Sequence, residues 1–140
     1  MLIGQYEHNL DLKGRMNFPV KFREDLGERF IITKGVDACV AVYSFEEWQH
    51  LTEKVKRLPE AKAALLKRFF FSGAVEMETD KQGRIVIPPH LRSYASLDKE
   101  VVVAGVLDKV EIWDKSHWNE NTGEMTAEAM SAAISAMEDF

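Results

Sequence analysis

Cysteine is almost absent from this chain of 140 residues, in which Cys39 is the only one. A single cysteine excludes an intramolecular disulfide and a cysteine metal cluster. The surrounding sequence DACVAV is mostly small and apolar, and free cysteine usually behaves as a small hydrophobe. We therefore expect Cys39 to be a buried core residue.

Long hydrophobic runs are also missing. No apolar stretch approaches the roughly 18 to 20 residues that a membrane-spanning helix needs, and the N-terminus MLIGQYEHNL does not resemble a signal peptide. Hydrophobic residues make up 46% of the chain and charged residues 29%, which is typical of a globular protein. The sequence predicts no membrane contact, and we expect the protein in the cytoplasm.

Residue constellations typical of enzymes are lacking as well. There is no HExxH, no glycine-rich phosphate loop and no GxSxG elbow, and SLDK at 96–99 is a weak match to the S-x-x-K pattern without its partner motifs. A catalytic pairing of Asp11 with Asp80 is an alternative, but each has a sufficient structural role in a turn. We predict no enzyme, no catalytic residue, no metal and no cofactor. The histidines have no metal-ligand spacing: His8, His50, His90 and His117.

What the chain does contain is an internal duplication. DLKGR at 11–15 returns as DKQGR at 80–84, and the alignment continues as Pro19 on Pro88 and, after one inserted residue, Trp48 on Trp118. Matches that stay in register over this distance indicate two copies of one unit. We divide the chain into a first repeat at 1–52, a helical linker at 53–72, a second repeat at 73–119 and an acidic helical tail at 120–140.

Each repeat has the same predicted order of elements. GQYEHNL with RMNFP, and GAVEMET with RIVIP, are expected to form β-hairpins, and helical turns are expected after Pro19 and Pro88. The β-branched runs FIITKG and VVVAG are expected to stop at their glycines, and CVAVY and KVEIW to form a further strand each. Ser44 and Glu47 form a capping-box pattern ahead of a helix in WQHLTEKV.

The linker is predicted to be helical from Pro59, because Ala63, Leu66 and Phe70 fall on one stripe at helical spacing. The sequence FFF at 69–71 suggests a stacking platform for bases. Three adjacent aromatic side chains point in different directions on a helix, however, so we expect them to pack in the core.

Charge is distributed unevenly along the chain. The net charge is −5, and residues 111–140 contain seven acids and one lysine. By contrast, 11–23 has a net charge of +3 and 80–92 of +2, so an acidic protein can still present a basic face. In the tail, Met130, Ile134 and Met137 lie on one helical face, which favours docking on its own protein or on a neighbouring subunit.

The repeated turn has the residues that a three-residue hairpin loop requires. A type I turn is followed there by a residue in the left-handed conformation, which is best glycine. Gly14 and Gly83 fit this position, because it costs an L-residue roughly 1 to 2 kcal/mol. Asp11 and Asp80 stand where a carboxylate accepts a backbone N–H two residues on. These residues build the loops without requiring an arginine after them.

Basic side chains lie on or beside both turns: Arg15 and Arg84, with Lys13 and Lys81. For one isolated turn, a solvated charged tip is the simpler interpretation. Two equivalent arginines on rigid loops can also bind a partner whose structure repeats, such as a nucleic acid. Guanidinium groups bind phosphate or the O6 and N7 atoms of guanine. The residues alone leave both interpretations open and make these four side chains candidates for DNA binding.

The two D-x-x-G-R turns, GRMNFP and GRIVIP after them, RFFFSGAVE and the paired Trp48 and Trp118 closely resemble the MraZ family of bacterial transcriptional regulators. The resemblance implies kinship with the swapped-hairpin DNA-binding domains of the AbrB and MazE type. The implied fold is α+β, with two tandem pseudo-symmetric swapped-hairpin AbrB-like β-barrel units, short helices, a helical linker and a C-terminal helix.

The resemblance also implies a function. Family members bind double-stranded DNA through the aspartate-to-arginine loops, with Arg15 and Arg84 as the principal contacts. Lys13 matches a basic loop position that holds Gln82 in the second repeat, and Lys81 could compensate there. The family usually represses the division and cell-wall gene cluster, acting on G-rich direct repeats upstream of its own operon. It forms ring-shaped homo-oligomers and associates with the nucleoid.

A second function class stays open. The same hairpin architecture occurs in antitoxins, so the loops could bind acidic side chains of a partner protein and act as a scaffold without catalytic activity. DNA affinity that falls steeply with salt would favour the first interpretation. A partner protein bound stoichiometrically without DNA would favour the second.

Overall fold

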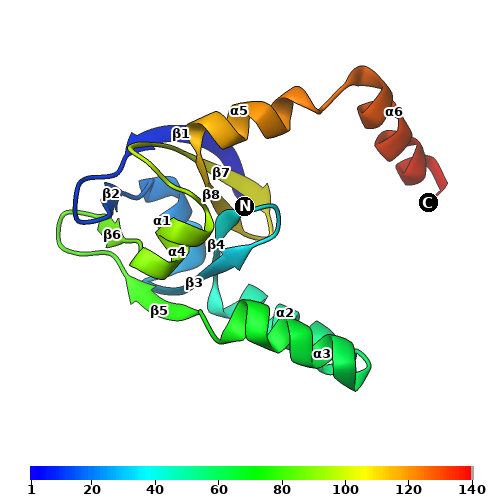
Figure 1. Ribbon diagram of the computed structural model, residues 1–140, viewed down its shortest axis with the longest axis horizontal. Helices are drawn as coiled ribbons and strands as arrows, with labels where there is room; N and C mark the ends of the chain where they lie inside the picture. Colours follow the sequence, from blue (N-terminus) through cyan, green and yellow to red (C-terminus); the bar gives the residue numbers. More distant parts are fainter. Residues whose placement is uncertain (140) are drawn as a thin grey trace.

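Two antiparallel sheets organise the computed structural model, which describes residues 1–139 (Figure 1). The larger sheet has six strands in the order β1-β7-β8-β4-β3-β5, and β2 and β6 form a separate two-stranded sheet. The strands are β1 (Leu2–Asn9), β2 (Arg15–Asn17), β3 (Arg29–Gly35), β4 (Cys39–Tyr43), β5 (Val75–Glu78), β6 (Arg84–Val86), β7 (Glu100–Leu107) and β8 (Val110–Asp114).

Helices follow the strands in both halves of the chain. They are α1 (Val20–Leu26), α2 (Phe45–Lys56), α3 (Glu60–Leu66), α4 (Pro89–Tyr94), α5 (Lys115–Gly123) and α6 (Ala127–Ser135), with a five-residue π-helix at Lys67–Phe71 and a 3-10 helix at Ala136–Asp139. Ser44 Oγ accepts the N–H of Glu47 at 3.1 Å, which caps α2 where the sequence predicted it. The predicted repeat boundaries at 52/53 and 119/120 fall within α2 and α5.

Both repeats contribute strands to both sheets. Met16 of β2 pairs with Ile85 of β6, and Ala41 of β4 pairs with Glu111 of β8. These are the positions that the duplication aligns with one another, so a pseudo-two-fold axis passes through both pairs. The predicted α+β class with tandem pseudo-symmetric units is confirmed. Strands of each repeat hydrogen-bond to strands of the other, and no closed barrel forms within residues 1–139.

The predicted hairpin in each repeat is limited to its turn. At the base of the turns, the N–H of Asp11 donates to the carbonyl of Arg15, and the N–H of Asp80 to that of Arg84, each at 2.9 Å. Beyond these bonds the strands separate: β1 pairs with β7, β5 with β3, and β2 with β6. The expected hairpin ladders are therefore wrong, because each of the four hairpin strands pairs with a strand of the opposite repeat.

The second β-branched run does not stop at its glycine. β7 continues through Gly105 to Leu107 and pairs with β1 along that length. A Cβ atom at position 105 would lie 2.7 Å from the backbone nitrogen of Ile3. The missing side chain thus lets β1 approach β7 closely, and Gly105 is a packing residue inside a strand.

The main core lies between the large sheet and the elements that carry β2, β6, α1 and α4. Phe22 and Phe30 are fully buried, and Phe18 stacks on Phe30 with ring centroids 5.5 Å apart. Cys39 is fully buried too, as predicted. A smaller cluster on the outer face of the sheet packs Ile31, Ala41 and Tyr43 under Trp48 and Leu51 of α2.

The linker packs against the body through its aromatic residues. Ala63 and Phe70 are buried, while the Phe69 ring contacts Tyr94 at 5.8 Å and the Phe71 ring contacts Trp48 at 4.6 Å between centroids. The three phenylalanines therefore pack against other parts of the chain, as predicted. The last turn of the linker, Lys67–Phe71, is a π-helix and not a regular α-helix.

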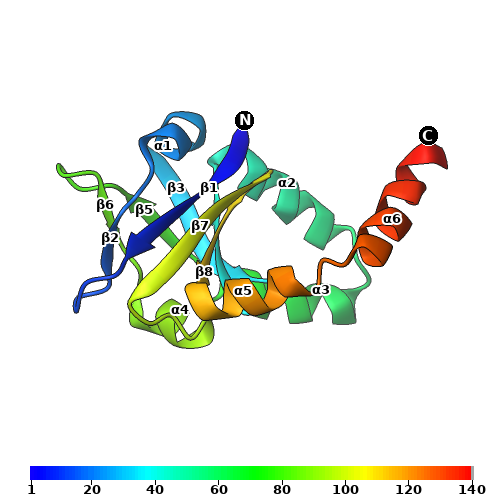
Figure 2. The same cartoon turned by 90° about the horizontal axis from the view of Figure 1, so that it is seen from above.

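The tail has a different environment. α5 leaves the body and α6 projects beyond it (Figures 1 and 2), and every residue from Gly123 to Met137 is exposed. The tail therefore does not dock on its own chain in the described residues, and Phe140, the last residue of the predicted tail, lies outside them. None of the helices at 1–139 is long and apolar enough to cross a membrane.

Candidate nucleic-acid interface

The two D-x-x-G-R loops project from one end of the molecule, on the left of Figures 1 and 2, opposite the α2–α3 hairpin and the tail. In the first loop, Asp11 Oδ1 accepts the N–H groups of Lys13 and Arg15, each at 2.9 Å. Asp11 Oδ2 accepts Arg15 Nε at 2.6 Å. The N–H of Gly14 donates to the Asp11 carbonyl at 3.0 Å, and Gly14 has φ +78°. One aspartate thus fixes the loop backbone and the arginine together.

The second loop repeats this arrangement. Asp80 Oδ1 accepts the N–H groups of Gln82 and Arg84 at 2.8 and 2.9 Å, and Oδ2 accepts Arg84 Nε at 2.9 Å. Gly83 has φ +76° and donates to the Asp80 carbonyl at 3.0 Å. The two loops therefore present an arginine in the same geometry, related by the pseudo-two-fold axis.

Each arginine is oriented through one nitrogen and leaves the rest of its guanidinium available. Nε is bound to the aspartate, and the side chains of Arg15 and Arg84 are 32% and 29% exposed. Within residues 1–139, neither guanidinium has a further ion-pair partner. The Nη groups can therefore donate to an external acceptor while the aspartate holds the side chain in place.

The small sheet arranges the arginines on one surface. In β2 and β6 the side chains of Met16 and Ile85 point into the core and are 2% and 1% exposed. Arg15 faces Val86 and Asn17 faces Arg84 in the register, so these four side chains alternate to the other face. Arg15 and Arg84 are then diagonal neighbours, about 7 to 8 Å apart at the backbone. A two-stranded ribbon of this kind fits the major groove of B-DNA.

The loop lysines differ between the repeats. Lys13 and Lys81 are both exposed, but the duplication aligns Lys13 with Gln82 and Lys81 with Leu12. Leu12 is fully exposed at the tip of the first loop. Each loop thus has one lysine, at a different position in the turn.

Two residues that the sequence reasoning left out of the site support the loops from the opposite repeat. A Cβ atom at Gly14 would lie 2.8 Å from Arg92 Cζ of α4, and one at Gly83 would lie 3.1 Å from an Nη atom of Arg23 of α1. The Nε atoms of Arg23 and Arg92 are buried and have no hydrogen-bond partner in the described part of the chain. The duplication aligns Arg23 with Arg92, but the sequence does not reveal which loop each one contacts.

The loop carboxylates are held in their charged form. The pKa of Asp11 and that of Asp80 lie below the ordinary value of 3.8, first because each carboxylate accepts the backbone N–H of its arginine. Burial opposes this shift, and the arginine side chain and a second backbone N–H reinforce it. The ionised aspartate is therefore part of the loop structure at neutral pH.

We expect both aspartates to titrate below 3.8 in the folded protein, as followed by carbon NMR of their carboxyl groups. A lowered folded-state pKa contributes stability above the unfolded value, and that contribution is lost as the pH falls through the folded value. The amide resonances of Lys13, Arg15, Gln82 and Arg84 should shift in the same acidic range. A midpoint at or above 3.8 would contradict the hydrogen bonds described.

Neither a metal site nor a pairing of the two loop aspartates is found in the part of the chain that the structure describes. No cluster of three or more histidine, cysteine, aspartate or glutamate side chains there is suited to a metal ion. Asp11 and Asp80 each bind their own loop, so the structure gives no support to the alternative of a catalytic pair.

Comparison with known proteins identifies a matching family and close relatives. The family described as "MraZ protein, putative antitoxin-like" matches residues 1–69 and again 70–140. A protein named transcriptional regulator MraZ from Caldanaerobacter subterraneus is 56% identical over 122 residues, covering 86% of this chain and 85% of the relative. A protein of the same name from Acetivibrio thermocellus is 50% identical over 135 residues, covering 95% and 94%. One from Thermoanaerobacter is 55% identical, covering 86% and 85%.

Proposed function

This chain belongs to the MraZ family, and we propose that it is a transcriptional regulator that binds double-stranded DNA through its two D-x-x-G-R loops. The main support for the proposal is the pair of equivalent arginines at one end of the molecule, each bound by the aspartate of its own loop. The relatives are named as transcriptional regulators, which is a non-enzymatic role.

The contacts divide into two kinds. Arg15 and Arg84 present Nη groups whose planar geometry suits guanine O6 and N7 in the major groove. Lys13 and Lys81 are point charges at the loop tips and suit phosphate oxygens. The rigid loops restrict the arginines before binding, so less conformational entropy is lost when DNA binds.

The names of the relatives support a regulatory role. We propose that the protein represses the division and cell-wall gene cluster by binding G-rich direct repeats upstream of its own operon. It would act in the cytoplasm, associated with the nucleoid, as a ring-shaped homo-oligomer. Loops on successive subunits would then contact spaced repeats together, and linked sites can gain about 10² to 10⁴ in apparent affinity.

The test is fluorescence anisotropy with a duplex from the region directly upstream of this gene. We expect binding roughly 10³-fold or more tighter than to a shuffled duplex of equal composition. Affinity should fall steeply with salt, with a log-log slope of about −0.9 for each neutralised phosphate. Equal affinity for both duplexes would contradict sequence-specific regulation.

A second candidate is a protein-binding scaffold, and the antitoxin-like wording of the family description favours keeping it. In this case the loop arginines would bind carboxylates of a partner. Affinity purification from nuclease-treated cells tests it. A stoichiometric protein partner without DNA, together with no preference for the upstream duplex, would favour the scaffold over the regulator.

A further inference from the structure

The tail helix differs from its counterpart in the first repeat. In the linker, α3 and its π-helix have two buried residues, Ala63 and Phe70. The family match places the tail at the equivalent position of the second repeat. α6 instead exposes Met130, Ile134 and Met137 by 41%, 55% and 66%. The apolar face of the tail is therefore unpartnered in the described residues of the single chain.

The tail is also strongly acidic. Residues 120–140 contain five acids and no lysine or arginine, and the side chains of Glu120, Glu124 and Glu128 are exposed. An apolar stripe with acidic neighbours fits a partner surface that is basic and partly apolar. It does not fit an anionic lipid surface or a nucleic acid.

The α2–α3 hairpin is such a surface. Residues 53–68 contain six basic side chains and two acids, and the six basic ones are all exposed: Lys54, Lys56, Arg57, Lys62, Lys67 and Arg68. Among residues 1–139 only Lys56 of these has an ion-pair partner, Glu53 at 3.7 Å. Leu58 and Leu65 are 37% and 64% exposed beside these charges.

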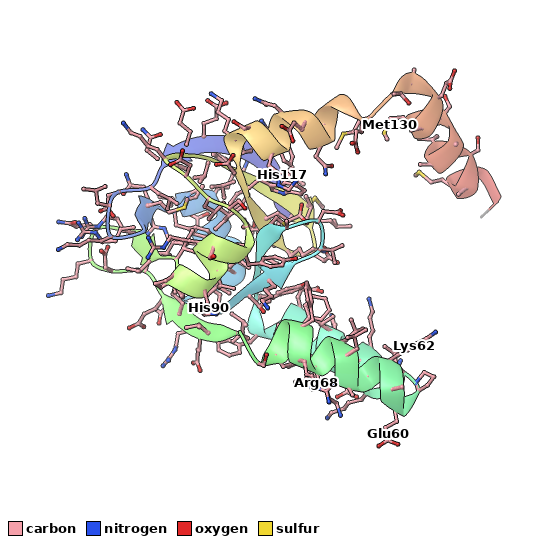
Figure 3. All side chains as sticks on the ribbon, in the orientation of Figure 1. Glu60, Lys62, Arg68, His90, His117 and Met130 are labelled. Atoms are coloured by element: carbon pink, nitrogen blue, oxygen red, sulfur yellow. The ribbon has the colours of Figure 1, made fainter. Side chains whose placement is uncertain are left out.

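One side of the hairpin has two basic residues with an apolar residue between them. These are Lys62, Leu65 and Arg68, which lie three residues apart in the sequence and are therefore neighbours on a helix. Figure 3 shows Lys62 near its free end and Arg68 nearer the body, with Met130 on the separate tail helix. The tail and the hairpin leave the body in different directions (Figure 1), so each is open to a second molecule.

We propose that the acidic tail of one copy of this chain docks on the basic α2–α3 hairpin of a second copy. In this contact the apolar side of the tail helix, formed by Met130, Ile134 and Met137, covers Leu58 and Leu65. The glutamates of the tail lie opposite Lys62 and Arg68. Because the tail and the hairpin are different surfaces, the contact can repeat head-to-tail from copy to copy, and the series closes into a ring when the rotation between copies allows it. This inference rests on the self-assembly included in the proposed function and identifies the surfaces involved.

Charge reversal tests the pairing. We expect Lys62→Glu/Arg68→Glu and, separately, Glu124→Lys/Glu128→Lys to raise the concentration for half-assembly about tenfold, as measured by sedimentation velocity. Combining the four substitutions in one chain should restore assembly, because the charges again attract. The control Glu24→Lys/Glu28→Lys makes the same charge change as the tail reversal on exposed residues of α1 and just after it, and it should leave assembly unchanged.

A cross-linking measurement identifies the chains in contact. Under mild oxidation, a mixture of Met130→Cys and Leu65→Cys chains should give a disulfide-linked dimer of the two. Efficient linkage within one doubly substituted chain at high dilution would overturn docking between copies. If none of the charge reversals changes assembly, the proposed surfaces are wrong and the ring must form through other contacts. A wild-type chain that stays monomeric would overturn the inference, while specific DNA binding by that monomer would leave the regulatory proposal standing.

Discussion

Replacing Arg15 or Arg84 by alanine should weaken binding to the upstream duplex about 10- to 100-fold, and replacing both should abolish detectable binding. Each bidentate arginine–guanine contact is worth roughly 1 to 3 kcal/mol, and every 1.4 kcal/mol is about tenfold in affinity. The side chains lie at the protein surface and are bound only to their own loop aspartates. Fold and assembly should therefore be unchanged, as checked by circular dichroism and sedimentation.

Two variants give this measurement its controls. Arg57→Ala removes an exposed arginine at the turn between α2 and α3, far from the loops (Figure 1), and should leave affinity for a single-repeat duplex nearly unchanged. Arg15→Lys keeps the positive charge but removes the planar guanidinium group that donates two parallel hydrogen bonds. The variant should therefore retain its attraction to phosphate and lose discrimination between bases. Full affinity in Arg15→Ala/Arg84→Ala would refute the loops as the DNA-binding site.

The salt dependence separates base contacts from phosphate contacts. Alanine at Lys13 or Lys81 should lower affinity for the specific and shuffled duplexes alike. It should also make the salt slope shallower by about 0.9 for each phosphate that the variant no longer neutralises. Because Lys13 and Lys81 occupy different positions in their loops, the two changes need not be equal.

Gly14→Ala should destabilise the folded protein by about 2 to 5 kcal/mol. An alanine at φ +78° costs roughly 1 to 2 kcal/mol, and overpacking adds roughly 1 to 3 kcal/mol. The new Cβ would lie 2.8 Å from Arg92 Cζ and 3.0 Å from the carbonyl oxygen of Ile87. Since the Ile87 carbonyl is backbone, the contact is not relieved by a side-chain rotation alone. Urea unfolding measures the change as a lower midpoint with an unchanged m value.

Two other glycines calibrate this prediction. Gly83→Ala has a similar φ of +76° but meets only the flexible end of Arg23, the nearest atom at 3.1 Å, so it should cost less than Gly14→Ala. Gly123 has nothing within 4 Å and an ordinary φ, so Gly123→Ala should leave stability unchanged or raise it slightly. Because Gly14 and Gly83 have similar φ, equal effects at these two positions would show that the closer contacts at Gly14 cost nothing in solution.

Local chemistry made much of the site predictable. The aspartate, the glycine and the arginine of each turn lie within five residues of one another, so their hydrogen bonds depend on the chain's own short-range geometry. The same is true of the helix that Ser44 caps. The duplication, visible only as a register of identical residues, correctly predicted two pseudo-symmetric units.

Strand pairing was not predictable in the same way. The alternation in GQYEHNL indicates a strand, but equally good apolar partners existed in RMNFP of the same repeat and in VVVAG of the other. Pairing β1 with β7 buries one shared core, and Gly105 permits the close approach that this pairing needs. The hairpin predictions failed because periodicity specifies which face of a strand is buried, and not which strand lies beside it.

By itself, the sequence determined the tandem repeats, the two tight turns and the arginines at their ends, because turn chemistry acts over a few neighbouring residues. Only the tertiary structure decided that Arg15 and Arg84 share one face of the β2–β6 ribbon and that Arg23 and Arg92 support the loops of the opposite repeat. It also left the tail exposed while the linker packs on the body. These features depend on contacts between residues far apart in the chain, which form only when both repeats fold around one core.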